Sequence, residues 1–93
     1  MNKLMRKIIA SLGLHNPGES YKVKVSDIII PEEFKATKPR FEKMIQKRKF
    51  YRKNNRFESK IVLNKDFLLI DGYTSYIIAK ENGMKYVEAY FVD

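Results

Sequence analysis

The fold is decided by residues 61–87, which read IVLNKDFLLIDGYTSYIIAKENGMKYV. Two apolar runs, at residues 60–64 and 67–70, are separated by the polar pair Lys65-Asp66. Short apolar runs joined by a tight polar turn are typical of a β-hairpin. This part of the sequence therefore predicts two antiparallel strands.

The residues after the hairpin predict a buried helix and a closing strand. Asp71-Gly72 turns the chain sharply, and we expect Thr74 or Ser75 to cap the helix that follows, because a hydroxyl oxygen accepts hydrogen bonds from free N–H groups at a helix start. The helix is apolar on most sides and is expected to end at Gly83. Residues 86–92 then predict a strand.

Three further elements are predicted before the hairpin. Apolar residues at helical spacing predict a short amphipathic helix over residues 2–12, and alternation of apolar and basic residues predicts a strand over 21–25. Another helix is expected from about residue 39 to 53. The order helix, strand, helix, hairpin, helix, strand predicts an α+β domain with a small mixed β-sheet over residues 21–93, after a helix and linker over 1–20.

The predicted helix at 39–53 has an ambiguous apolar side. Pro39 suits its first position, where the missing N–H group of proline is harmless. On a wheel of about 100° per residue, one side carries an expected core stripe. That stripe consists of Phe41, Met44, Ile45 and Tyr51. Because Arg48 and Arg52 fall within the same stripe, either the helix ends or bends near Lys47, or the two arginines reach past the sheet edge.

The composition is that of one globular domain with a local basic segment. Hydrophobic residues make up 44% of the 93 residues, and there is no cysteine, which excludes disulfides, thiolate zinc sites and cysteine nucleophiles. Apolar runs such as Ile28–Ile30 are far too short to span a membrane. We therefore expect a soluble protein of a reducing compartment, the cytoplasm. Residues 35–60 carry eleven basic and two acidic side chains, so nearly the whole net charge of +8 lies there. Such a segment indicates an anionic partner or a solvated helix face.

The densest part of the basic segment, residues 43–56, interleaves cations with aromatic residues and two asparagines. Cations neutralise phosphates, aromatic rings stack on unpaired bases, and asparagine can read a base edge. The candidate nucleic-acid-binding residues are Lys43, Lys47, Arg48, Lys49, Tyr51, Arg52, Lys53 and Arg56. The alternative is a protein-binding patch in which exposed Phe50 and Tyr51 are the anchors. A contiguous cationic face would favour DNA or RNA.

Residues 21–92 resemble the ParB/sulfiredoxin-like domain. Within residues 61–87 the matching features are a strand, an Asp-Gly turn, a helix, a glycine and a strand beginning with valine. Upstream, residues 23–31 match the opening strand and acidic loop of that family, and the approach to the hairpin follows a helix that begins after a proline. The resemblance implies a stand-alone ParB-like α+β fold.

The resemblance also implies a phosphate site of a nucleotide at the start of the helix after the hairpin. The positions that correspond here are Asp71, Gly72, Tyr73, Thr74 and Ser75. Free N–H groups and the helix dipole favour an anion at such a place, and glycine permits close backbone approach. Relatives carry arginine, His-Arg or Cys-His-Arg in this region, whereas this chain has Tyr-Thr-Ser. The site is therefore degenerate, and a nucleotide is the one candidate cofactor.

The carboxylates offer a small catalytic set and no metal site. Glu32, Glu33 and Asp71 are the candidates for a ParB-like nuclease or nucleotide hydrolase, since phosphodiester hydrolysis needs clustered carboxylates. Without a histidine or arginine beside them, the sequence favours a module without catalysis. The leading hypothesis is a nucleic-acid-binding module of a prophage, plasmid or other mobile element. The alternatives are a module that binds or inhibits a nucleic-acid-handling protein, and the enzyme using the Asp71–Ser75 turn.

Overall fold

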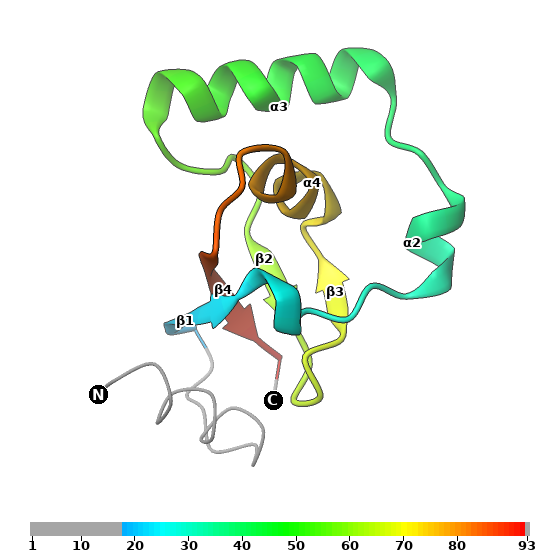
Figure 1. The fold of residues 1–93 in the computed structure, drawn as a ribbon, viewed down its shortest axis with the longest axis vertical. Coiled ribbons are helices and arrows are strands. Elements are labelled where there is room, and N and C mark those ends of the chain that lie inside the picture. The colour runs from blue at the N-terminus through cyan, green and yellow to red at the C-terminus, as the bar shows by residue number, and fades with distance from the viewer. Residues whose placement is uncertain (1–17, 93) are drawn as a thin grey trace.

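The structure is a computed structural model that describes residues 18–92. The helix expected over residues 2–12 lies outside the described residues, as does most of the linker up to residue 20. The described chain forms four strands and four helical segments (Figure 1). Their order is β1 (Ser20–Lys24), the 3₁₀ helix η1 (Val25–Asp27), α2 (Glu32–Ala36), α3 (Phe41–Asn54), β2 (Ile61–Leu63), β3 (Leu69–Asp71), α4 (Tyr73–Glu81) and β4 (Tyr86–Phe91).

The four strands form one mixed sheet in the order β1-β4-β2-β3. β1 pairs antiparallel with β4, and β2 pairs antiparallel with β3, whereas β2 and β4 are parallel. The parallel pair follows from α4, which carries the chain from β3 back across to β4. The α+β class and the mixed sheet predicted from the sequence are thus confirmed.

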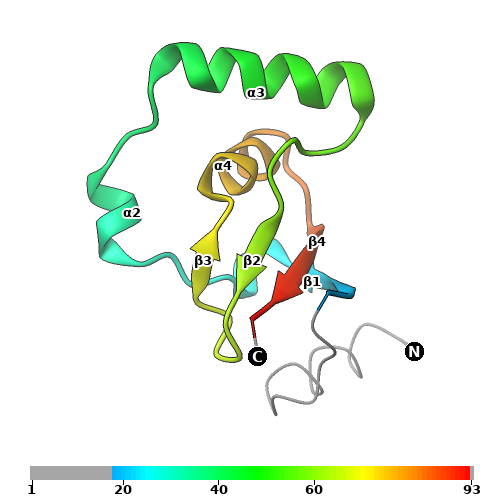
Figure 2. The ribbon, with the colours of Figure 1, turned by 180° about the vertical axis from the view of Figure 1, so that it is seen from behind.

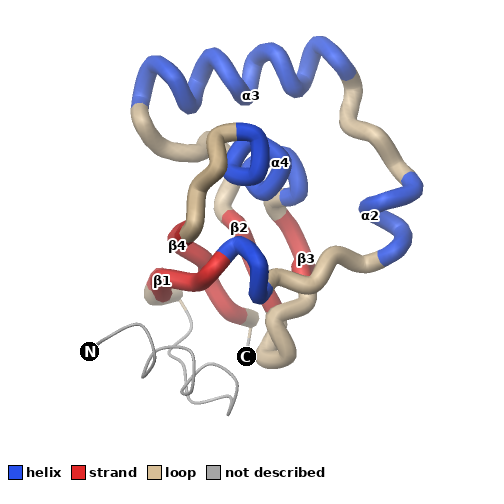
Figure 3. The backbone as a smooth tube through the Cα atoms, viewed as in Figure 1, coloured by secondary structure: helices blue, strands red, loops and turns tan. Residues whose placement is uncertain are grey.

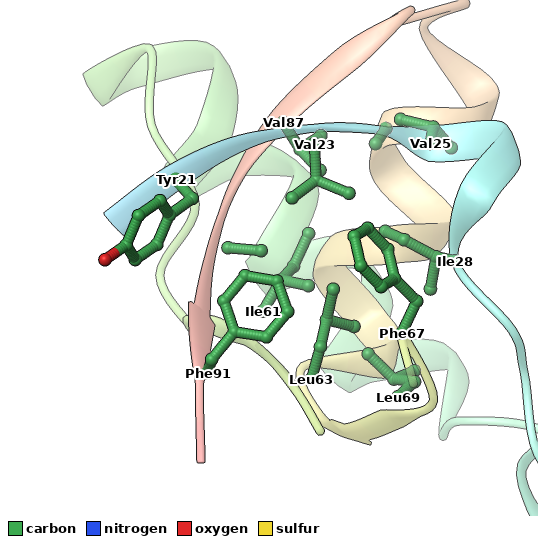
Figure 4. Packing of buried hydrophobic residues seen from close by; sticks show 12 residues of the cluster. Tyr21, Val23, Val25, Ile28, Ile61, Leu63, Phe67, Leu69, Val87 and Phe91 are labelled. Carbon is green, nitrogen blue, oxygen red and sulfur yellow. The ribbon is translucent and has the colours of Figure 1, made fainter. Parts of the chain in front are cut away.

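The core lies between one face of the sheet and the segments packed on it, η1, the hairpin loop and α4. Figure 4 shows Phe67 and Phe91 facing each other, with Leu63 between the strands below them. The ring centroids of Phe67 and Phe91 are 5.5 Å apart, in edge-to-face geometry. Tyr21 packs on Phe91 in the same way, at 5.7 Å. Aromatic residues therefore fill much of this small core.

The other face of the sheet carries no helix of the described chain (Figure 2). α4 lies between the strands and α3, and α3 forms the outermost layer (Figures 1 and 2). α3 contacts α4 rather than the sheet. Residues 37–40 join α2 to α3, and residues 55–60 join α3 to β2 (Figure 3). α3 is thus an outer helix with most of its surface exposed.

Several boundaries differ from the sequence prediction. α3 begins at Phe41, because Arg40 is still extended and its carbonyl oxygen accepts the first helical hydrogen bond, from the N–H of Met44. No element is predicted for residues 32–36, and they form the short helix α2, whose N-cap is Pro31. Acidic residues in a first turn favour such a helix through its dipole.

The hairpin turn is longer than the predicted pair Lys65-Asp66. The side-chain oxygen of Asn64 accepts hydrogen bonds from the N–H groups of Asp66 and Leu68. Phe67 takes a left-handed backbone conformation, with φ of 67°, and its ring is buried. The returning strand therefore starts at residue 69 rather than 67.

Candidate nucleic-acid interface

The inner side of α3 is fixed by packing against α4 and the loop that follows α3. Met44 is buried, and the ring of Tyr51 stacks on Phe57 with a centroid distance of 5.1 Å. The hydroxyl of Tyr51 contacts the sulfur of Met84 at 3.6 Å. Phe41, expected in this stripe, is 76% exposed, so that part of the prediction is wrong. α3 covers a single helix rather than a sheet, and only a narrow stripe of it is buried.

Two of the cations predicted to bind nucleic acid, Arg48 and Lys47, form ion pairs that hold α3 in place. The guanidinium of Arg48 donates two hydrogen bonds to the carboxylate of Glu81 on α4, of 3.0 and 2.6 Å. This pairing lowers the pKa of Glu81 and raises that of Arg48. The ammonium of Lys47 donates to Glu58 at 3.1 Å and to the hydroxyl of Ser59 at 2.7 Å. The helix neither ends nor bends near Lys47, since acidic partners compensate the charges on its inner side.

The remaining cations of the segment are exposed. Lys43, Lys49 and Lys53 lie within a sector of about 120° on the side away from α4, at 100° per residue. All three are exposed, and within the described residues they form no ion pair. Arg52 is also exposed, but it lies toward α4, where it borders a small cavity of about 140 Å³ together with Arg48. The outer side of α3 therefore presents three cations that form no ion pair in the described part of the chain, with the exposed Glu42 near its N-terminal end.

One aromatic residue, Phe50, lies on this outer side between Lys53 and Lys43 on the helix wheel, and it is half-exposed. Tyr51 points inward. The guanidinium of Arg56, beyond the end of α3, lies 5.1 Å from the centroid of the Phe50 ring. Arg56 therefore extends the row of cations past the C-terminal end of the helix. From here on, the outer face of α3 means Lys43, Lys49, Lys53 and Arg56.

The Asp71–Ser75 turn forms a second candidate site. Asp71, Gly72, Tyr73 and Thr74 line one hollow of about 230 Å³, together with Lys43 of α3 and residues near α2. Ser75 is not in its lining, because its hydroxyl is buried and donates a hydrogen bond of 2.6 Å to the carbonyl oxygen of Ser59. Four of the five predicted phosphate-binding residues are thus brought together.

The start of α4 differs from the prediction in two respects. Its N-cap is Gly72, with φ of 91°, and no side chain caps the helix, so the expected cap at Thr74 or Ser75 is wrong. A side chain at Gly72 would overlap the carbonyl oxygen of Lys60, which shows that the glycine is required for packing against the chain before β2. The carboxylate of Asp71 accepts the N–H of Gly72 at 2.8 Å. It therefore places a negative charge at the helix start, where a phosphate would bind.

The catalytic candidates are not assembled. Glu32 and Glu33 are exposed on α2, Glu32 lies 3.5 Å from Lys35, and neither lines the hollow at Asp71. Among residues 18–92 there is no group of three metal-binding side chains. A further hollow, not predicted from the sequence, lies between the loop after α3 and the sheet, and Lys22, Tyr86 and Glu88 contribute to it. The alternation of outward-facing residues along the strands that became β1 and β4 could have indicated it.

Comparison with solved structures defines the class of this domain as a ParB-N-like fold. A structure described as a pNOB8-like ParB-N domain in its C2221 form superposes with a TM-score of 0.68 and 25% sequence identity, over 81% of this chain. A second pNOB8-like ParB N-domain structure gives a TM-score of 0.63 and 28% identity, also over 81% of this chain. This chain spans only 30% and 28% of the lengths of those two chains. No family model and no curated protein matches the sequence.

The fold predicted from the Asp-Gly turn and its surroundings is therefore confirmed. The chain is a ParB-like module, and none of the described helices is long and apolar enough to cross a membrane.

Proposed function

We propose that this ParB-like module binds nucleic acid, DNA or RNA, through the outer face of α3 and without catalysis. The observation that carries the proposal is that the cations split into two sets. Arg48 and Lys47 are ion-paired and position α3, whereas the outer face carries four cations, of which the three on the helix are exposed and, within the described residues, without an acidic partner. Unpaired cations on one face can each neutralise a phosphate and release its counterion.

The experiment compares substitutions that remove the same charge at different places. Lys49→Gln and Lys53→Gln each remove one charge from the outer face, and Lys65→Gln removes one from the hairpin tip, at the far end of the molecule from α3 (Figure 1). We expect Lys49→Gln and Lys53→Gln each to weaken binding of a labelled mixed-sequence oligonucleotide at least threefold, and the double variant to weaken it at least tenfold. The single variant Lys65→Gln should change binding less than twofold. Equal losses for the three single variants would show that only the net charge matters and would refute the outer face as the binding site.

A second candidate function is nucleotide binding at the hollow of Asp71, Gly72 and Thr74. It is supported by the free N–H groups at the start of α4 and by Lys43, which lines the same hollow. The test is a titration with CTP and ATP, followed through the backbone amide signals of Gly72 and Thr74 in NMR spectra. Saturable shifts at both amides would support nucleotide binding, and their absence at millimolar nucleotide would exclude it.

We also propose, from the ParB-like fold and the basic character of the module, that it belongs to a prophage, plasmid or other mobile element and acts in the cytoplasm. In cells that carry the gene, the double variant should keep its binding defect and the phenotype of the gene should be lost. This result would show that the outer face is required for the biological role of the module.

A further inference from the structure

A hollow of about 620 Å³ lies between the loop that follows α3 and the sheet. Its floor comes from β1 and β4, where Lys22 pairs with Glu88 in the strand register, so that both side chains point to the same face. Tyr86 is two residues from Glu88 and shares that face. Asn55 and Arg56 form the wall. The face concerned is the one without a helix of the described chain, and the loop from α3 passes α4 to reach the upper end of β2 (Figure 2).

The lining combines the groups that recognise a nucleotide unit. The ring of Tyr86 is half-exposed, and the ammonium of Lys22 lies 5.2 Å from its centroid. Asn55 is exposed, and its side-chain amide forms no hydrogen bond to another described residue. The guanidinium of Arg56 and the carboxylate of Glu88 complete the set. The volume suits a base with its sugar, since ligand hollows typically measure about 300–1,000 Å³.

The hollow is continuous with the outer face of α3. Arg56 belongs to both, because it lines the hollow while its guanidinium lies over Phe50 on the outward side of α3. A nucleic-acid backbone held by Lys49 and Lys53 therefore has its next cation at the rim of the hollow. Such a backbone can deliver a base into the hollow only if that base is unpaired, because the bases of a duplex are stacked inside it.

We propose that this hollow takes one unpaired base of a single-stranded nucleic acid whose backbone lies along the outer face of α3. The inference rests on the proposed function. The base stacks on the ring of Tyr86 in the place of the Lys22 ammonium, which moves to the adjacent phosphate. The amide of Asn55 meets the base edge, as asparagine does in base recognition.

Glu88 sets a preference among bases. Its carboxylate repels phosphates but accepts a hydrogen bond from an exocyclic amino group, which cytosine has and thymine lacks. The strand (dC)12 is therefore expected to bind at least fivefold more tightly than (dT)12, the lower limit of discrimination by a good base contact. In Glu88→Val this ratio falls to about one, while binding of (dT)12 itself becomes tighter because a negative charge is gone.

The experiment measures the dissociation constants of (dC)12, (dT)12 and a 12-base-pair duplex by fluorescence anisotropy. Tyr86→Ile replaces the ring with a β-branched side chain that suits a strand, and it is expected to weaken binding of (dC)12 about tenfold, the effect of losing one stacked base, with binding of the duplex unchanged. Asn55→Gly is the milder variant, because glycine readily takes the φ of 54° found at this position. It is expected to reduce the ratio of (dC)12 to (dT)12 binding without loss of folding.

NMR spectra of the unsubstituted protein give a readout that does not depend on the variants folding. Addition of (dC)12 should shift the amide signals of Lys22, Asn55, Tyr86 and Glu88 together with those of α3. Shifts confined to α3, or a Tyr86→Ile variant that binds (dC)12 normally, would overturn this inference and leave the proposed function standing. Absence of binding to all three oligonucleotides would overturn both. Equal affinity for CMP and (dC)12 would show a mononucleotide site and overturn the single-strand assignment.

Discussion

Gly72→Ala tests how the start of α4 is built. Gly72 has φ of 91°, and a Cβ atom there would overlap the carbonyl oxygen of Lys60 and lie 2.8 Å from the Cα of Ile61. A left-handed conformation costs an L-residue about 1–2 kcal/mol. Forcing an extra carbon into a packed interior costs about 1–3 kcal/mol more. We therefore expect the substitution to lower the free energy of unfolding by about 2–5 kcal/mol, a large part of the 5–15 kcal/mol typical of a domain.

The assay is urea unfolding followed by circular dichroism, with Gly83→Ala as the matched control. Gly83 also has a positive φ, of 63°, but a Cβ atom there meets nothing within 4 Å. It should lose only the conformational part, about 1–2 kcal/mol. Equal losses for the two variants would refute the overlap with Lys60. The expected difference, measured without any ligand, would show that the glycine is required by packing, whether or not a phosphate binds beside it.

Four other substitutions test the packing of α3 and α4. Met44→Ala should cost about 2–5 kcal/mol of unfolding free energy, because Met44 is 5% exposed, whereas Phe41→Ala should cost about 0.5 kcal/mol or less; the reverse order in urea unfolding would show that α3 is rotated. Ser75→Ala should cost about 1–3 kcal/mol, because the Ser59 carbonyl loses a buried donor, and a cost near zero would contradict that hydrogen bond. The hydrogen bonds from Arg48 hold the pKa of Glu81 below its ordinary 4.5, so this pair stabilises the fold above that pH and the stabilisation is lost as the pH falls through and below it. Glu81→Gln should therefore make the free energy of unfolding less dependent on pH in acid. Equal acid sensitivity of the two proteins would rule out this contribution.

Local sequence patterns predicted the elements well, because each is encoded by neighbouring residues. The hairpin, the Asp71-Gly72 turn, the buried helix and the closing strand all occur in the predicted order. The same Asp-Gly turn also led to the ParB-like fold. These predictions depend on the periodicity of apolar residues and on the residue types found in turns, and both are set by fewer than ten neighbouring residues.

The details that were wrong depend on contacts between distant residues. Arg48 looked misplaced on the inner side of α3 because its partner, Glu81, lies 33 residues further along the chain. Gly72 was interpreted through a ligand, whereas the atom that requires it is the carbonyl oxygen of Lys60. The core stripe predicted for α3 was wide enough to cover a sheet. Because α3 packs on the single helix α4 instead, the stripe is narrower and Phe41 stays exposed. Such contacts become visible only once the chain is folded.

The salt dependence of binding tests directly whether the outer face of α3 binds phosphates. With about four phosphates neutralised, the logarithm of the association constant should fall with the logarithm of salt concentration with a slope of about −4 on a duplex and about −3 on a single strand. The variant Lys49→Gln/Lys53→Gln should make each slope less steep by about 1.5–2. A slope near zero, or a slope that the double variant leaves unchanged, would contradict the assignment of this face.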